Sequence, residues 1–62
     1  MPEIGNLVTI KITTNGVLCC ITGSVESVGL IPKKPDAWWI QLVGLSAWFY
    51  SDDVNVEIKV ID

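Results

Sequence analysis

The sequence contains no histidine, and only two cysteines are found among its 62 residues. Histidine is the side chain that most often acts as a general acid or base near neutral pH, so its absence argues against acid–base catalysis. Two adjacent cysteines without histidine cannot complete a structural zinc or iron–sulfur site. No nucleophile elbow and no glycine-rich phosphate loop is present. We therefore expect a protein that is not an enzyme and holds no metal or cofactor, the one catalytic alternative being a site shared by copies at a symmetry axis.

Long hydrophobic runs are also missing. No apolar stretch approaches the length of a membrane-spanning helix, and residues 1–7 do not combine a basic region with a long apolar segment. We expect a cytoplasmic, soluble protein with no membrane partner. Because there is no internal repeat and no low-complexity tract, residues 1–62 are interpreted as a single domain.

Apolar side chains, in contrast, are abundant. Half of the chain is hydrophobic (50%), and all five aromatic residues lie between residues 38 and 50. A chain this short has a large surface for its volume, so one small core cannot hide this many apolar side chains. Copies of the chain are expected to cover one another, which predicts a homo-oligomer.

Alternation of apolar and polar residues predicts five strands. They span residues 7–13, 17–28, 38–43, 46–51 and 54–61. Asn15-Gly16 predicts a tight hairpin after the first strand, and Gly23 predicts a bend or bulge within the second. Residues 29–37, in which two prolines bracket two lysines, are predicted to be a loop, and residues 51–53 a short turn. The inward side chains of the last strand are predicted to be Val54, Val56, Ile58 and Val60.

Five short antiparallel strands with a bent second strand indicate an all-β fold, a strongly bent five-stranded barrel of the SH3-like class with little or no helix. Successive residues of a strand face opposite sides, so Trp38 faces away from Trp39, and Phe49 faces away from its two aromatic neighbours. By the same rule Cys19 and Cys20 are expected to point apart, one thiol into the core and one outward.

Two segments resemble a known family more narrowly than this class. Residues 8–29, VTIKITTNGVLCCITGSVESVG, resemble the first Sm motif of the Sm, Lsm and Hfq family, and GSVESV is especially similar to the Hfq version. Residues 48–58, WFYSDDVNVEI, resemble the second motif. The resemblance implies a ring of identical Sm-like subunits, in which the fourth strand of one subunit pairs with the fifth strand of the next, and single-stranded RNA as the ligand.

The resemblance also assigns candidate site residues. It implies an inter-subunit, pore-proximal site formed by Tyr50, Asp52 and Asp53. It implies a subunit contact near Trp48, Val54 and Val56. The sequence departs from the family at Gly29, where an aspartate is usual, and at residues 51–53, where acid replaces the lysine and histidine or the arginine and glycine of the family.

Charge bears on the expected ligand. Four basic residues face seven acidic ones, giving a net charge of −3, and RNA affinity depends on cations that neutralise phosphate. Lys33 and Lys34 form the only basic pair and are the candidate phosphate contacts, while Tyr50 can stack a base. A second interpretation therefore stays open: an oligomeric protein-interaction or scaffold module, with exposed tryptophans beside residues 32–35 that hold a protein partner and no nucleic acid.

Overall fold

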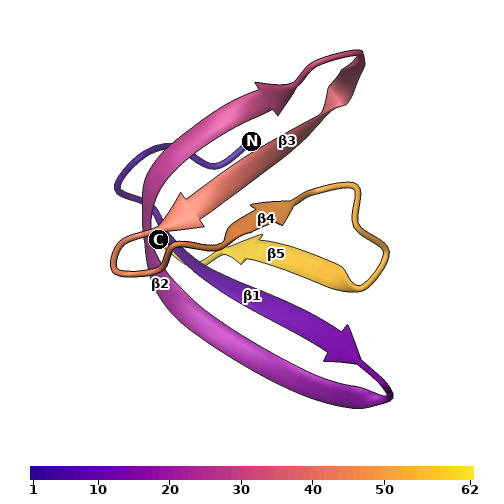
Figure 1. Cartoon of the computed structure of the whole chain (residues 1–62). Coiled ribbons are helices and arrows are strands. Elements are labelled where there is room, and N and C mark those ends of the chain that lie inside the picture. The colour runs from indigo at the N-terminus through magenta and orange to yellow at the C-terminus, as the bar shows by residue number, and fades with distance from the viewer.

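The computed structural model describes all 62 residues and consists of five antiparallel strands without a helix. The strands are β1 (Leu7–Thr14), β2 (Val17–Ile31), β3 (Lys34–Leu42), β4 (Trp48–Tyr50) and β5 (Val56–Val60). They form one sheet in the order β4-β3-β2-β1-β5, strongly bent along β2 (Figure 1). The predicted all-β, five-stranded, bent antiparallel class is confirmed. The structure contains no helix long and apolar enough to cross a membrane.

The central strand β2 belongs to two hairpins. Its residues 17–24 pair with β1 and its residues 25–31 pair with β3. The ladder to β3 is irregular between Val25 and Ser27, so the bulge lies there and not at Gly23 as predicted. Gly23 has a different reason to be small, because a Cβ at this position would lie 3.3 Å from Cδ1 of Leu42. The glycine makes room for a buried leucine, and the bend follows it along the strand.

Of the two hairpin turns, one was predicted correctly from the sequence and the other was not. Asn15 and Gly16 both have positive φ, 52° and 77°, which confirms the predicted tight turn. The predicted loop over residues 29–37 is wrong, because β2 continues to Ile31 and β3 begins at Lys34. Only Pro32 and Lys33 form the turn, and Lys33 adopts a φ of 66°.

Both prolines of this hairpin lie where a backbone N–H is not needed. Pro32 is in the turn itself. Pro35 lies where the ladder shifts from the pair Ile31–Lys34 to the pair Leu30–Trp38, so that residues 35–37 have no partner on β2. A missing N–H therefore costs no ladder hydrogen bond, which is why a proline is tolerated inside β3.

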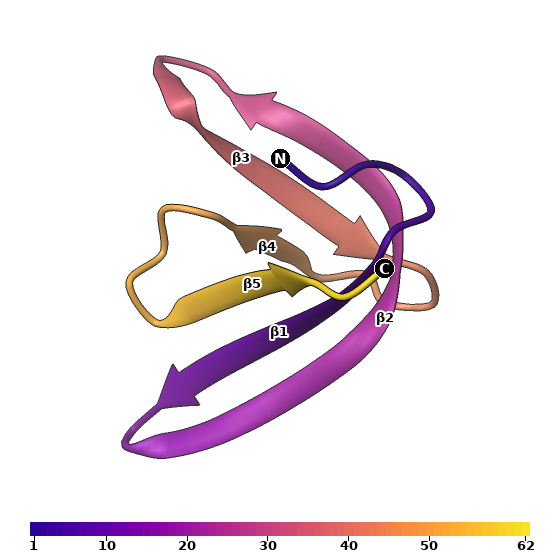
Figure 2. The same cartoon turned by 180° about the vertical axis from the view of Figure 1, so that it is seen from behind.

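The core is small and lies where the sheet folds over itself. It comprises Val8, Ile10, Val25, Ile40, Leu42 and Phe49. The β1–β2 hairpin extends past this core, and its tip points to the same side as the tip of the β2–β3 hairpin (Figures 1 and 2). Both Cys19 and Cys20 are consequently exposed. The prediction of one buried thiol is wrong, because Cys19 pairs with Ile12 on the inner face but beyond the reach of the core.

The sheet ends in two open edges. β4 pairs only with β3, and β5 pairs only with β1. The chain exposes 4264 Å², somewhat more than the roughly 4,000 Å² expected of a compact monomer of its mass. Both edge strands are shorter than predicted, and Val54 is 96% exposed instead of facing inward. Val54 belongs to the β4–β5 turn, where Val56 N donates to Asp53 O at 3.1 Å and β5 begins only afterwards.

Candidate functional site

Three aromatic side chains share the outer face of β3 and β4. We call Trp39, Trp48 and Tyr50 the aromatic surface. Strand alternation turns Phe49 into the core and its two neighbours outward, which agrees with the prediction that Phe49 faces away from them. Trp39 and Trp48 are stacked, with ring centroids 5.2 Å apart and an interplanar angle of 22°. Tyr50 lies directly opposite Trp39 in the ladder. Trp48 stays 54% exposed and Tyr50 40% exposed, so no part of the chain covers this surface.

Gly29 on β2 packs directly against the aromatic surface. It lies opposite Trp39 in the β2–β3 ladder, and a Cβ at Gly29 would lie only 2.6 Å from the indole ring. The ring of Trp39 therefore lies against bare backbone. Gly29, where the family resembled by the sequence usually has an aspartate, is thus explained by the tryptophan opposite it.

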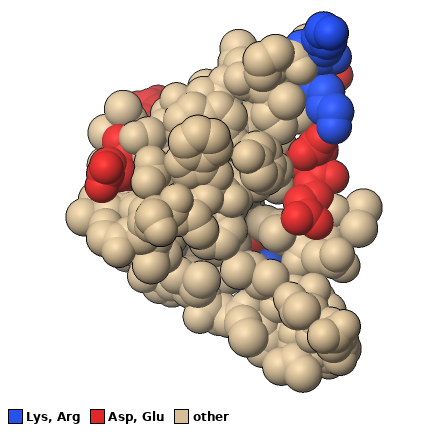
Figure 3. Space-filling view, in the orientation of Figure 1, with Lys and Arg blue, Asp and Glu red and all other residues tan.

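The two lysines of the predicted basic pair differ in their surroundings. Lys34 Nζ lies 2.8 Å from Asp52 Oδ2, and this ion pair joins the β2–β3 hairpin to the β4–β5 turn. The hydrogen bond from Lys34 lowers the pKa of Asp52, and the bond to Asp52 raises the pKa of Lys34. Figure 3 shows the result on the surface, with basic atoms at the hairpin tip directly above acidic atoms. Lys33 is left as the basic side chain of this hairpin without an ion-pair partner.

Backbone and hydroxyl groups hold the same turn in place. Ser51 N donates to Trp38 O at 2.8 Å, and Trp38 N donates to Ser51 Oγ at 2.9 Å. Asn55 N donates to Asp53 Oδ1 at 2.9 Å. The predicted site residues Lys34, Asp52 and Asp53 are therefore brought to one end of the molecule, next to the end of β4. This end of the molecule carries the Lys34–Asp52 ion pair and the carboxylate of Asp53, which has no cation partner. A surface with these charges attracts phosphate poorly.

The open edge of β4 is aromatic. Because Ser51 N bonds to β3, the alternation of an antiparallel ladder directs the backbone of Phe49 to β3 as well. The N–H and C=O groups of Trp48 and the N–H of Tyr50 therefore point to the open side, while Tyr50 O accepts from Asp53 N at 3.2 Å. The residues with outward side chains on β4 are thus the ones that offer backbone groups to a partner strand.

The open edge of β5 is aliphatic. Thr13 N donates to Asn55 O at 2.9 Å and Ile61 N donates to Leu7 O at 2.8 Å, so the odd-numbered residues of this segment bond to β1. Ile58 and Val60 then direct their N–H and C=O groups to the open side. Their side chains face the core side of the sheet, and Val60 is 47% exposed there.

The predicted subunit-contact residues lie at different depths in these edges. Trp48 is on the edge of β4, and Val56 begins β5 with its side chain half-buried. Val54 lies off the edge, in the turn. The prediction did not single out Ile58 and Val60 as residues of an open edge, although their alternation with Glu57 and Lys59 was visible in the sequence. It also missed Trp39, whose role depends on its long-range register with Gly29.

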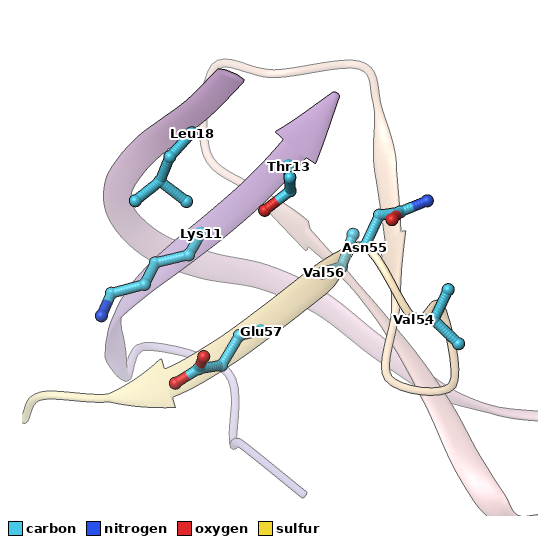
Figure 4. Close-up of a pocket in the computed structure, with 7 residues that line it drawn as sticks. All are labelled: Lys11, Thr13, Leu18, Val54, Asn55, Val56 and Glu57. Atoms are coloured by element: carbon cyan, nitrogen blue, oxygen red, sulfur yellow. The ribbon is translucent and has the colours of Figure 1, made fainter. Parts of the chain in front are cut away.

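A groove of about 320 Å³ opens beside the start of β5. Its walls come from β1, β2, β5 and the β4–β5 turn (Figure 4). The lining residues are Lys11, Thr13, Leu18, Val54, Asn55, Val56 and Glu57. Its polar residues lie on the outer face of the sheet and its apolar residues lie toward the hairpin tip and the turn, so the groove is mixed in character.

No group of three or more histidine, cysteine, aspartate or glutamate side chains is placed to hold a metal ion. Comparisons with family models, curated proteins and solved structures find no match to this chain.

Proposed function

We propose that this chain is a self-assembling subunit of an Sm-like ring, joined by the β4 edge of one copy to the β5 edge of the next. The observation that carries the proposal is the character of the two open edges. On each of them the residues that offer free backbone groups are apolar, Trp48 and Tyr50 on β4 and Ile58 and Val60 on β5. Charged residues alternate with them on β5 and are bonded to β1.

The side chains of the two edges fit each other in an antiparallel pair. Residues directly opposite in such a pair carry their side chains on the same face. When Trp48 and Tyr50 lie opposite Val60 and Ile58 of another copy, the outer face of one sheet continues into the inner face of the next. The exposed aromatic rings then cover the open side of the neighbouring core.

This joint removes two unfavourable exposures at once. Unpaired edges are templates for uncontrolled strand addition, and pairing them in a closed ring leaves none open. Full burial of a large apolar side chain is worth about 1.5–3 kcal/mol, and Trp48, Tyr50 and Val60 are all around half exposed in the single chain. Assembly therefore accounts for the apolar surplus in the sequence.

The charges favour a scaffold over an RNA-binding ring. Lys34 is held by Asp52, so one of the two candidate phosphate contacts is already neutralised. Asp53 lies in the same turn and repels phosphate. Single-stranded RNA remains the ligand to test because Lys33 and the aromatic surface could hold a backbone and a base, and we expect its affinity to be low and salt-dependent.

The assembly is tested by a matched pair of proline substitutions. Val60 directs its N–H to the open edge, whereas Lys59 donates its own to β1, so a proline removes an edge donor in one case and a ladder bond in the other. Light scattering of the purified chain should give a defined oligomer. Val60→Pro should be a monomer by light scattering and folded by circular dichroism. Lys59→Pro should be unfolded by circular dichroism. A wild-type chain that is monomeric and folded at all concentrations would contradict the proposal.

RNA binding is tested separately. The assembled chain is titrated with uridine-rich and adenine-rich oligonucleotides at low and high salt, with Lys33→Gln as the variant. We expect weak binding that disappears with added salt and falls further in the variant. Tight binding that survives high salt would instead make RNA the main ligand of the ring.

A further inference from the structure

We infer that the groove beside β5 receives the Ser51–Asp53 turn of a neighbouring copy, with Lys11 as the cation that pairs with Asp53 of that copy. The inference rests on the proposed joint and names a contact that the joint creates. The groove has seven lining residues (Figure 4), and nothing in its own chain fills it.

The direction of the strands brings the turn to the groove. In an antiparallel joint, β4 runs from Trp48 toward Tyr50 while the neighbouring β5 runs the other way. The chain that leaves Tyr50 therefore arrives at the start of the neighbouring β5, near residues 54–56. These residues line the groove. The β4–β5 turn protrudes between the two hairpin tips, so it is free to reach a neighbour (Figures 1 and 2).

The charges of the two surfaces are complementary. Lys11 lies opposite Glu57 in the β1–β5 ladder, and Lys59 lies two positions along the same face, just outside the groove, so this face carries two lysines and one glutamate. Lys11 forms no ion pair within the chain, whose only ion pair is Lys34–Asp52. The outer face of β1 and β5, which borders the groove, therefore has one more basic residue than acidic residues.

The turn supplies the opposite charge. Asp52 is engaged by Lys34, but Asp53 has no cation partner. Asp53 uses Oδ1 to accept from Asn55 N at 2.9 Å, which leaves Oδ2 available. Leu18 and Val54 provide apolar walls at the rim, and they are 60% and 96% exposed in the single chain. One carboxylate, a cation without a partner and an apolar rim are the components of a docking contact.

The inference is tested by charge exchange. Lys11→Glu and Asp53→Lys are made singly and together, and the dissociation constant of the assembly is measured by light scattering and sedimentation. Each single change should raise the dissociation constant about tenfold, and the double change should restore most of it. Lys33→Glu makes the same change in charge at the other hairpin and should leave the assembly unchanged.

Milder variants keep the test independent of folding. Asp53→Asn retains the oxygen that accepts from Asn55 N, and Lys11→Gln retains most of the aliphatic stem. Each should weaken assembly several-fold and flatten its salt dependence. If the wild type assembles and these variants assemble equally well at low salt, the inference fails and the proposed joint stands. If the wild type is a monomer, the proposed joint itself fails.

Discussion

The two edge strands β4 and β5 border the same sheet, yet they are built from opposite patterns. β4 is three residues long, turns one phenylalanine inward and leaves its aromatic neighbours outside. β5 is five residues long, turns its aliphatic residues inward and its charged residues outward. In β4 the outward residues offer free backbone groups, and in β5 the inward ones do. The difference shows that both edges can offer backbone groups from apolar residues although these residues face outward on one strand and inward on the other.

The anchoring of the two strands differs as well. β4 is held at its end by Ser51, whose N–H and hydroxyl oxygen both bond to Trp38, and by the Lys34–Asp52 ion pair. β5 is held at both ends by backbone bonds to β1. The short aromatic strand thus depends on side chains outside its ladder, whereas the longer one depends on the ladder itself. Substitutions should therefore affect the two strands unequally.

The largest effect is expected at the inward residue of β4. Phe49→Ala removes the only core side chain that this strand contributes and should lower the free energy of unfolding by about 3–5 kcal/mol. This is most of the stability of a small domain. Urea denaturation followed by fluorescence measures it, and Tyr50→Ala, one residue along and outward-facing, is the matched control. Equal losses for the two variants would refute the inward–outward assignment of β4.

The next largest effect is expected at Gly29, which packs under the aromatic surface. Gly29→Ala places a methyl group against the ring of Trp39 and should cost about 1–3 kcal/mol through overpacking. It should also displace Trp39 from Trp48, so the circular dichroism signal of the stacked indoles should weaken. Ser27→Ala, on the same strand, is the control. An unchanged stack in the glycine variant would show that Gly29 does not support it.

A smaller effect on the monomer, with a larger one on assembly, is expected at Trp48. Its ring is 54% exposed, so Trp48→Ala should lower the free energy of unfolding of the monomer by only about 1 kcal/mol, mainly through the lost stack. The same change should weaken the assembly more than tenfold. Leu30→Ala is the control, because Leu30 is 63% exposed but lies away from both open edges. Equal effects of the two variants on assembly would refute the role of the β4 edge.

Local patterns predicted much of this fold. Alternation correctly placed Trp38 on the opposite face from Trp39 and Phe49 on the opposite face from its two aromatic neighbours, and the structure adds that Phe49 is the one in the core. Asn15-Gly16 predicted its turn because both residues tolerate positive φ. These features depend on residues close together in the chain. The failures have a different origin. Pro32 and Pro35 led to the wrong prediction of a loop. The sequence does not tell whether a backbone N–H at either position would have had a partner in the ladder.

The candidate site was less predictable because its parts meet through register. Gly29 faces Trp39 only through the β2–β3 ladder, and Lys34 meets Asp52 only because the hairpin and the β4–β5 turn lie side by side. Cys19 lies on the inner face but beyond the core, and Val54 lies in a turn. Alternation gives the direction of a side chain, while the extent of the core determines whether anything covers it.

The smallest effect is expected from the ion pair that anchors β4. The pKa of Asp52 is lowered in the folded chain, chiefly by its hydrogen bond from Lys34. A lowered pKa means that the stabilisation is present above the unfolded pKa, for which 3.8 is the ordinary value, and is lost as the pH falls through the folded value. Lys34 has a raised pKa, so its share is present below the ordinary value of 10.5 and is lost as the pH rises through the folded value.

Stability should therefore be level at neutral pH and should fall slightly toward acid and toward strong alkali. Asp52→Asn removes the charge and should reduce both slopes, with only a small loss at neutral pH because the pair is exposed to solvent. Urea midpoints measured between about pH 2 and about pH 5, and again above about pH 10, give the slopes. Asp36→Asn, a second exposed aspartate without an ion pair, is the control. If both variants change the acid slope equally, the Lys34–Asp52 pair does not anchor β4, and Ser51 alone accounts for the difference between the two edges.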